Sequence, residues 1–157
     1  MTTAHIINRS TRSTENWTVG ALYDGQQKKM KVFMISESQK IKKLFDELCA
    51  QPKRLFPPVR QPLDAPSKPG VYIIRKGETV LHVGRTIRGR EGLHQRLRNH
   101  LHGSSSFTNK YLKGEGAILR KGGYTYQYLQ LEDPRERALL EAYAVGTFCP
   151  EHIGLGE

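Results

Sequence analysis

Hydrophobic side chains in the second half of the chain recur at two different spacings, and each spacing predicts a type of element. Gly70–Ile74 and Thr79–Val83 are short runs rich in Val and Ile, and the polar residues between them include Gly77. Two such runs joined by a glycine-containing turn are typical of a β-hairpin. Tyr124–Leu129 alternates aromatic and polar residues, which predicts a further, half-buried strand.

Apolar residues three or four positions apart predict helices around these strands. The first helix carries leucines at every fourth position from 93 to 101, so they form one stripe. A second helix is predicted over 109–119. The last is predicted to begin at Pro134, with Asp133 as its N-cap, and to run to about Phe148.

The first part of the chain is more polar and predicts a smaller appendage. Residues 1–30 are rich in Thr and Ser, with a short strand or arm near 17–23, and Lys31–Ile35 is predicted as a strand. Ser36 or Ser38 then offers an N-cap for a helix. One face of that helix carries the apolar residues Ile41, Leu44, Phe45 and Leu48.

Proline marks the boundary between the two parts. Six of the eight prolines fall between Pro52 and Pro69, which predicts an extended, semi-rigid connector. The chain is therefore predicted to divide into an N-terminal appendage over 1–51, a Pro-rich connector over 52–69 and a module over 70–157.

The charge of the chain narrows the class of partner. The formal net charge is +10 and the sequence pI is about 9.8. Residues 70–130 hold eleven Lys or Arg against three acids, a net charge of +8, so the excess lies with the module. A polyanion such as DNA fits this distribution, although a basic surface that only keeps the protein in solution would also account for it.

Cysteine usage and hydropathy bear on the compartment. Cys49 and Cys149 are the only cysteines, and no Cys/His spacing typical of zinc is present. A disulfide between them is conceivable, but reduced thiols are the default expectation. The N-terminus lacks a secretory pattern and no apolar run is long enough for a bilayer, so the expectation is a cytoplasmic protein without a membrane partner.

Two tripeptides in the predicted hairpin carry chemically useful side chains. Gly70-Val71-Tyr72 is followed, ten residues after its tyrosine, by His82-Val83-Gly84, and the hairpin would set Tyr72 near His82. Arg96 and His100 are four residues apart on the leucine helix and therefore face the same way. Glu141 lies on the last helix. Purely structural roles would also account for these residues. Tyr72 could be an aromatic side chain packed on the sheet, and Arg96 and Glu141 could be surface charges or an ion pair.

Taken in order, these motifs resemble the GIY-YIG nuclease family. The resemblance covers residues 70 to about 153 and rests on the two tripeptides, on Gln95–His100 and on Leu140-Glu141-Ala142. It implies a mixed α/β (α+β) fold, with a small three-stranded antiparallel sheet flanked by helices. An N-terminal strand–helix appendage joined by a Pro-rich arm is similar to the compact restriction endonucleases of that family.

The resemblance also implies roles in phosphodiester hydrolysis. Such a reaction needs a deprotonated water, a stabilised pentacovalent anion and a neutralised leaving oxygen. Tyr72 would contact the water as general base, Arg96 would clamp the scissile phosphate, and His100 would assist the water or bind phosphate. Glu141, rather than its rival Glu136, would hold one Mg²⁺, for which Mn²⁺ can substitute. A phenol with a pKa near ~10 needs cationic neighbours to act as a base.

Two positions depart from the family pattern. His82 stands where the family usually has tyrosine, which leaves the general base open between Tyr72 and His82. The family often has an asparagine shortly after a proline near the end of the module, whereas Pro150 is followed by Glu151 and His152. His152 is a candidate replacement, or the role is absent.

The predicted function is a Mg²⁺-dependent, sequence-specific double-stranded DNA endonuclease of restriction type, without an organic cofactor. One active site per chain and two strands to cut favour a homodimer. The alternatives are a structure-selective nuclease acting on branched or damaged DNA or on RNA, and a non-catalytic DNA-binding module on the same scaffold. Contacts to the DNA backbone outside the reacting phosphate are predicted for Arg85, Arg88, Asn109, Lys110 and Lys121.

Overall fold

The computed structural model describes residues 18–22, 31–87 and 92–154, and the chain divides into two compact units, 1–40 and 41–157. In the first unit, β1 (Thr18–Leu22) and β2 (Lys31–Ile35) pair as an antiparallel two-stranded sheet. The strand predicted over 31–35 is confirmed, and the residues near 17–23 supply its partner strand.

Helix α1 (Glu37–Ala50) begins where the serine cap was predicted. The Gln39 backbone N–H donates to Ser36 Oγ at 3.3 Å, and the Ser36 N–H donates to Gln39 Oε1 at 3.0 Å. This reciprocal pair is a capping box, which satisfies backbone donors that the first helical turn leaves unpaired. Ser36 is therefore the cap.

The second unit is built on a four-stranded antiparallel sheet in the order β3–β6–β4–β5. Its strands are β3 (Arg54–Leu55), β4 (Gly70–Lys76), β5 (Thr79–Arg85) and β6 (Tyr124–Gln130). The hairpin and the third strand that the sequence predicts are confirmed. The two-residue β3 is an addition, and it comes from the stretch predicted to be only a connector.

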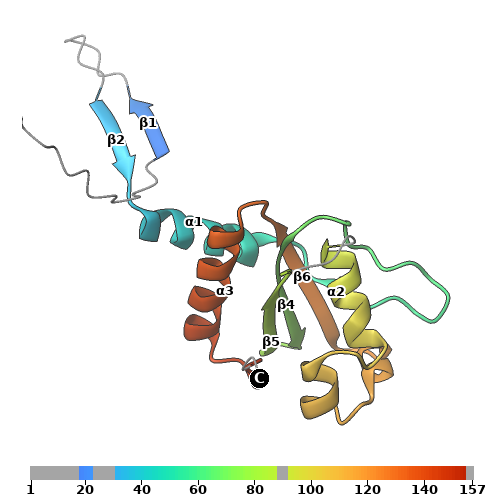
Figure 1. The fold of residues 1–157 in the computed structure, drawn as a ribbon. Helices are drawn as coiled ribbons and strands as arrows, with labels where there is room; N and C mark the ends of the chain where they lie inside the picture. The colour runs from blue at the N-terminus through green and yellow to red at the C-terminus, as the bar shows by residue number, and fades with distance from the viewer. Residues whose placement is uncertain (1–17, 23–30, 88–91, 155–157) are drawn as a thin grey trace, which may run out of the picture. The chain divides into compact units, whose positions relative to one another are not determined.

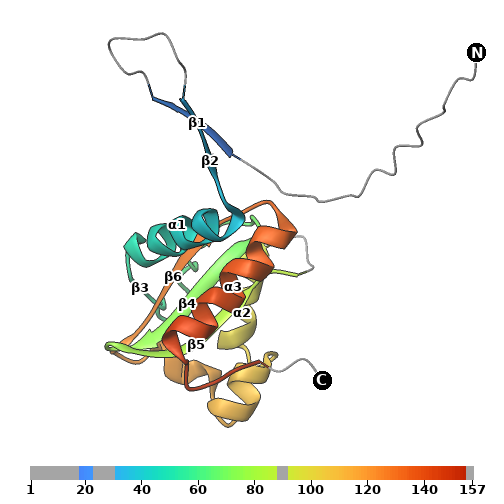
Figure 2. The same ribbon diagram turned by 90° about the vertical axis from the view of Figure 1, so that its left-hand side faces the viewer.

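Helices cover both faces of this sheet, so β4 is buried on both sides (Figures 1 and 2). Tyr72 and Ile74 pack with the leucines of α2 (Gly92–Leu101) on one face. Val71 and Ile73 pack on the other face with Leu140 of α3 (Pro134–Phe148) and with Leu48 of α1. Leu48 belongs to this core, and the compact units divide between Lys40 and Ile41.

Helix α3 has the ends that the sequence predicts. Asp133 caps it by accepting the Glu136 backbone N–H at 2.8 Å, and Pro134 occupies the first turn, where its missing N–H costs nothing. The helix stops at Cys149, whose φ of 45° is left-handed. Its C-terminal residue Phe148 matches the predicted end.

The single helix predicted over 109–119 is wrong. A π-helical turn (Phe107–Tyr111) and a 3-10 helix (Gly116–Arg120) take its place. Lys113 and Gly114 between them have positive φ values of 53° and 85°, which a continuous right-handed helix cannot contain. Gly114 permits this turn, because glycine adopts a positive φ without a steric penalty.

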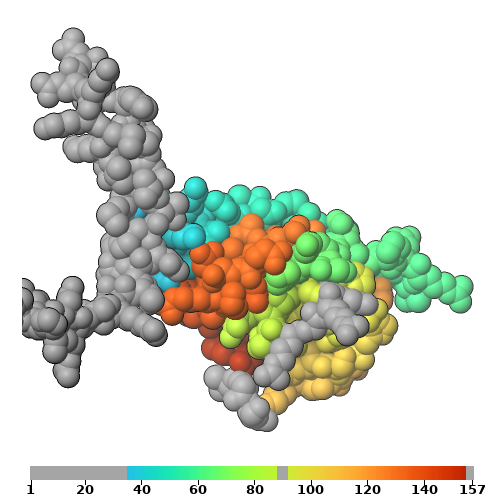
Figure 3. All heavy atoms as spheres, turned by 45° about the horizontal axis from the view of Figure 1, so that its top comes forward, coloured from blue at the N-terminus to red at the C-terminus, as the bar shows by residue number. Residues whose placement is uncertain are grey.

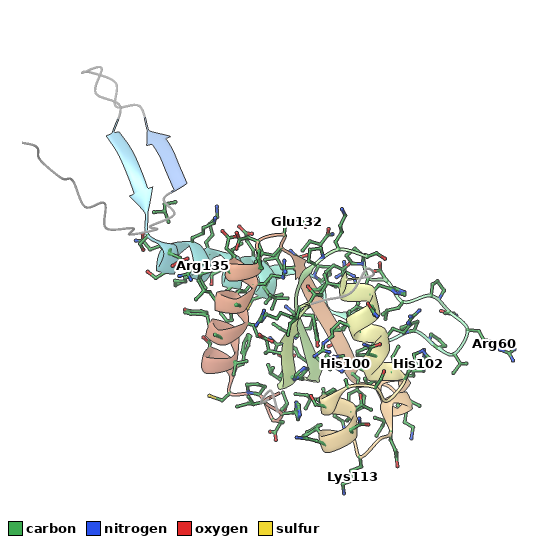
Figure 4. All side chains as sticks on the ribbon, in the orientation of Figure 1. Arg60, His100, His102, Lys113, Glu132 and Arg135 are labelled. Carbon is green, nitrogen blue, oxygen red and sulfur yellow. The ribbon has the colours of Figure 1, made fainter. Side chains whose placement is uncertain are left out.

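The loop between β3 and β4 projects from the second unit, as the green segment of Figure 3 shows. Arg120 Nη1 donates to the carbonyls of Pro57 and Pro58, and Arg54 pairs with Asp64 at 2.9 Å, so the base of the loop is held. Arg60 lies at its tip (Figure 4), with a φ of 73°.

Two further expectations bear on the environment of the protein. Among the described residues, the helices are too short or too polar to cross a lipid bilayer. Cys49 and Cys149 are both exposed free thiols.

Candidate active site

A cavity of about 430 Å³ lies beside the end of β5, between α2 and α3. Strand β5 contributes His82, Gly84 and Arg85, α2 contributes Arg96, and α3 contributes Glu141. Side chains that the sequence places far apart therefore meet at one hollow. Among the described residues that line it, Tyr72 and His100 are absent, because both lie behind the wall that His82 and Gly84 form.

A β-bulge gives β5 the geometry that this wall requires. The register between β4 and β5 shifts between Ile74 and Arg75, because Ile74 pairs with His82 whereas Arg75 pairs with Val80. Leu81 is the extra residue, and a bulge of this kind changes which face the following side chains point to. Leu81 packs in the α2 core while His82 pairs opposite Ile74, so both belong to the same face of the sheet.

Tyr72 is fully buried, and its hydroxyl forms a 2.7 Å hydrogen bond with His100 Nε2. A Cβ on Gly84 would overlap that hydroxyl and lie 2.6 Å from Tyr72 Cζ, so only glycine leaves room for the phenol. Burial raises the pKa of Tyr72 to about 12, although the nearby Arg96 guanidinium acts to lower it. The phenol is therefore neutral in this state of the protein.

His82 is buried in a cluster of rings. It stacks on Phe107, with ring centroids 5.0 Å apart and planes at 11°, and the ring of Tyr72 lies 6.0 Å away. Its Nδ1 is 3.3 Å from the His152 carbonyl and 3.2 Å from His152 Nδ1. Burial lowers the pKa of His82 to about 4, so this imidazole is uncharged at neutral pH.

His152 is the candidate replacement for the asparagine of the family pattern. In the structure its side chain contacts the imidazole of His82. It is bridged to β5 through its own backbone, since its N–H donates to the Leu81 carbonyl at 2.9 Å. Burial lowers its pKa. The contact places His152 against His82, where it helps to fix the orientation of that ring.

His100 lies on the buried side of α2 and bonds through both ring nitrogens (Figure 4). Nε2 faces Tyr72, and Nδ1 is 2.6 Å from Ser105 Oγ. Burial, together with the neighbouring His82 and Arg96, holds the pKa of His100 well below its ordinary value. Arg96 is near enough to act on the pKa of His100, and His100 is the more deeply buried of the two.

The two arginines of the cavity differ in their partners. Arg85 Nε donates to Glu141 Oε2 at 2.6 Å, in an ion pair whose side chains are 27% and 28% exposed. Arg96 Nε is buried, and within the described part of the chain it has no hydrogen-bond partner. A buried guanidinium nitrogen without a partner is costly, which points to an anionic ligand that completes its bonding.

Three of the five residues predicted to contact the DNA backbone lie outside the cavity. Asn109 and Lys110, in the π-helical turn, and Lys121, after the 3-10 helix, are all exposed. Arg85 lies in the cavity wall beside Glu141, which is nearer to the reacting centre than the sequence predicts. Arg88 lies outside the described residues.

Several residues that stabilise the site were not predicted from the sequence. Ser105 and Thr108 are buried next to His100, between the leucine helix and the helix predicted over 109–119. Arg137 is buried and donates to the carbonyls of Thr86, Leu131 and Glu132, which ties α3 to the end of β5. The one indication in the sequence is that Arg137 lies one helical turn before Glu141 on the predicted helix.

The donor set of the cavity suits a hard cation. Within the described residues, no group of three or more His, Cys, Asp or Glu side chains is arranged to hold a metal ion. Glu141 offers a single carboxylate next to open volume, and Arg85 contacts only its Oε2. Mg²⁺ is often bound through one carboxylate, waters and phosphate oxygens, so the residues present fit Mg²⁺ and do not fit a zinc site.

No family model matches this chain, and no curated protein matches it. It is similar to solved structures of the GIY-YIG N-terminal endonuclease domain of UvrC from Thermotoga maritima. A point mutant bound to its catalytic divalent cation gives a TM-score of 0.44 and 21% identity, over 77% of this chain and 100% of that one. The magnesium-bound domain gives a TM-score of 0.42 and 22% identity, over 74% and 97%.

Proposed function

We propose that this protein is a Mg²⁺-dependent DNA endonuclease that hydrolyses phosphodiester bonds. The observation that carries the proposal is the convergence of Arg96 and Glu141 on one cavity, with the Tyr72 hydroxyl against its Gly84 wall. These are the three kinds of group that the reaction needs, a phosphate clamp, a hard-metal ligand and a proton acceptor. The net charge of +8 over residues 70–130 supports a polyanionic substrate.

Arg96 is the group best placed to bind the scissile phosphate. Its Nε lacks a partner in the described structure, and a guanidinium forms paired hydrogen bonds with phosphate oxygens. Because Arg96 also lies close to the phenol of Tyr72, binding of a phosphate would bring the reacting phosphorus next to that hydroxyl. Arg85 adds positive charge at the same wall.

Tyr72 and His100 together provide the route for the proton of the attacking water. The phenol is protonated at neutral pH, because burial raises its pKa to about 12, so it can take the proton of the water only by passing on its own. Its hydroxyl is bonded to His100, whose low pKa leaves the imidazole neutral and able to take a proton. His82 lies beside the same wall as a second neutral imidazole, and the ring stack on Phe107 fixes its position.

Glu141 would hold the Mg²⁺, which when bound polarises the phosphoryl group and neutralises the leaving oxygen. Arg85 already orients this carboxylate through the 2.6 Å ion pair. Glu136, the rival in the sequence, belongs to the first turn of α3, where its N–H donates to Asp133. Mn²⁺ shares the preference for oxygen ligands and is proposed to substitute.

We further propose that the chain cuts double-stranded DNA at specific sequences and acts as a homodimer. Each chain would supply one active site around Glu141, and cutting both strands needs two such sites, which a two-fold dimer supplies. The exposed Asn109, Lys110 and Lys121 would contact the backbone around the cut.

The test is cleavage of supercoiled plasmid in Mg²⁺ and in EDTA, with wild-type protein, Glu141→Gln and the matched Glu136→Gln. We expect wild type and Glu136→Gln to cut in Mg²⁺ only, and Glu141→Gln to cut at least about 100-fold more slowly while it still binds DNA. Discrete fragment ends on linear duplex would support sequence specificity.

Three results would contradict the proposal in different ways. Cutting confined to junctions or to RNA would replace sequence specificity with structure selectivity. DNA binding without nicking under any divalent metal would favour a non-catalytic module. Equal rates for Glu141→Gln and wild type would refute the metal assignment.

A further inference from the structure

A closed set of hydrogen bonds lies behind Tyr72, on the side away from the cavity. His100, Ser105 and Thr108 form it, and each of them is at most 3% exposed. His100 Nδ1 is 2.6 Å from Ser105 Oγ, and Ser105 Oγ is 2.9 Å from Thr108 Oγ1. Thr108 Oγ1 is in turn 2.7 Å from the His100 backbone carbonyl.

The number of protons in this set determines which atom donates in each bond. The His100 carbonyl can only accept a hydrogen bond, so the Thr108 hydroxyl donates its one proton to that carbonyl. Thr108 Oγ1 must then accept from Ser105, whose hydroxyl has its own single proton. Ser105 Oγ therefore accepts in its remaining contacts, from the Thr108 backbone N–H at 3.1 Å and from His100 Nδ1.

The same count determines the tautomer of His100. Nδ1 carries the proton, because Ser105 has none left to give it. Burial keeps the ring neutral, so Nε2 is the unprotonated nitrogen. The 2.7 Å bond to Tyr72 therefore runs from the phenol O–H to Nε2, and the lone pairs of the phenol oxygen remain for another donor.

We propose that Ser105 and Thr108 are positioning residues, which hold His100 in the tautomer that accepts the Tyr72 proton during phosphodiester hydrolysis. This inference rests on the proposed function, in which Tyr72 takes a proton from the attacking water. The direction of the Tyr72–His100 bond is what a relay through both residues needs. With the opposite tautomer, His100 would donate to the phenol and would have no lone pair toward it.

The proton balance of the step follows from this arrangement. An O–H bond of the water breaks as its proton moves to Tyr72 Oη, and the phenol O–H proton moves to His100 Nε2. The electron pair left on the water oxygen forms the new bond to phosphorus, and the ester P–O bond breaks. The leaving oxygen then takes a proton from solvent, and His100 returns its proton to solvent through Tyr72.

Ser105 has a second effect in this step. The Nδ1–H···Oγ bond persists when His100 becomes an imidazolium, since that form donates from both nitrogens. The ring therefore does not need to rotate. A serine hydroxyl fills the place that a carboxylate takes in hydrolytic triads, so it orients the ring without giving it a permanent counter-charge.

The first test reads the tautomer directly. ¹⁵N-histidine-labelled full-length protein is examined by NMR at neutral pH, and His100 is assigned by its loss in His100→Gln. We expect protonated Nδ1 and unprotonated Nε2 in wild type. A ring protonated at Nε2 would overturn the proposal whether or not the protein cuts DNA.

The second test changes the set with an isostere. Thr108→Val removes the acceptor of the Ser105 proton, so Ser105 can turn and donate to Nδ1, which moves the ring proton to Nε2. We expect this tautomer change and a 10- to 100-fold loss of the single-turnover rate, from the loss of one acid–base group. DNA affinity should change less than 2-fold, and Thr108→Ser should restore both tautomer and rate.

The matched control is Thr147→Val, because Thr147 Oγ1 also donates to a carbonyl, that of Tyr143, at 2.8 Å. It should leave tautomer and rate unchanged. Thr108→Val that folds, keeps the Nδ1 tautomer and cuts at the wild-type rate would overturn the proposal. Wild-type protein that cuts no DNA would refute the proposed function itself, and with it the relay. If Thr108→Val does not fold, Ser105→Ala takes its place, with the same loss of rate expected.

Discussion

The residues around the cavity form two halves, a buried half and a charged half, which differ in whether their polar groups already have hydrogen-bond partners. Behind the wall, the Tyr72 hydroxyl and His100 are bonded to each other, and in the wall itself His82 is stacked on Phe107 and bonded to His152. In the cavity itself, the charged groups are partly exposed, and the described part of the chain leaves Arg96 Nε without a partner. The polar groups of the buried half are hydrogen-bonded without a ligand, whereas the charged half needs a ligand to complete its hydrogen bonds.

This difference separates the origin of stability from the origin of binding. Groups of the buried half are neutral and fully packed, so they hold the core of the α2 face together. Groups of the charged half contribute little to folding, since partly exposed ion pairs are worth about 0–1 kcal/mol. Changes in the first half should therefore affect both folding and chemistry, and changes in the second should affect mainly ligands.

The largest effect is expected for Tyr72→Phe. This change removes the hydroxyl that links the cavity to His100, so we expect the single-turnover cleavage rate to fall on the order of 10³-fold with DNA affinity retained. Leaving His100 Nε2 without its donor should also cost about 1 kcal/mol of unfolding free energy. Quench-flow cleavage and urea denaturation measure the two quantities.

Tyr126→Phe is the control for that change. Its hydroxyl donates to the Asp64 carbonyl at 3.0 Å, outside the cavity, so a buried tyrosine hydroxyl is lost in both variants. Tyr126→Phe should cut at the wild-type rate. Equal rate losses in the two variants would mean that Tyr72 acts through packing alone.

The second-largest effect is expected on the free energy of unfolding when the pH is lowered. The pKa of His82 is about 4 in the folded protein and near 6.5 when unfolded, so the unfolded chain binds more protons between these values. Stability is therefore complete above pH 6.5 and falls as the pH drops toward 4, by about 3 kcal/mol in total. His100 contributes in the same direction.

Urea denaturation at pH 7 and pH 5 checks this expectation. Most of the fall occurs above pH 4, and we expect His82→Gln to show a shallower dependence on pH than wild type. A free energy of unfolding that stays constant from pH 7 to pH 5 would contradict the burial of these neutral rings.

The smallest effect is expected for Arg85→Ala in the charged half. Its ion pair with Glu141 is partly exposed, so its loss should lower the unfolding free energy by less than about 1 kcal/mol. Arg137→Ala is the matched change of a buried arginine with three carbonyl partners, and it should cost about 3 kcal/mol. Similar losses for both in urea titrations would remove the distinction between the two halves.

The sequence predicts those parts of the fold that depend on local patterns. The hairpin follows from two β-branched runs around Gly77, and the buried face of α2 follows from leucines spaced four apart. The start of α3 follows from Asp133 and Pro134, a cap and a first-turn residue with few alternatives. These signals act over four to eight residues, so tertiary packing seldom overrides them.

The remaining features depend on contacts between distant segments. Nothing near Leu81 indicates a bulge, because it arises from the pairing of β5 with β4. The helix expected over 109–119 fails at Lys113 and Gly114, between two segments whose Phe107 and Leu119 pack in the core under α2. The bonding of Ser105 to His100 and of Arg85 to Glu141 also joins residues that no short motif connects.

The contact between Gly84 and Tyr72 bears on how related sequences can be identified. A single methyl group at position 84 would occupy the volume of the phenol oxygen. Any distant homologue that keeps this tyrosine in this rotamer must also keep a residue without a side chain opposite it, however far the rest has diverged. The two residues, twelve positions apart across a hairpin, are thus expected to change together or not at all.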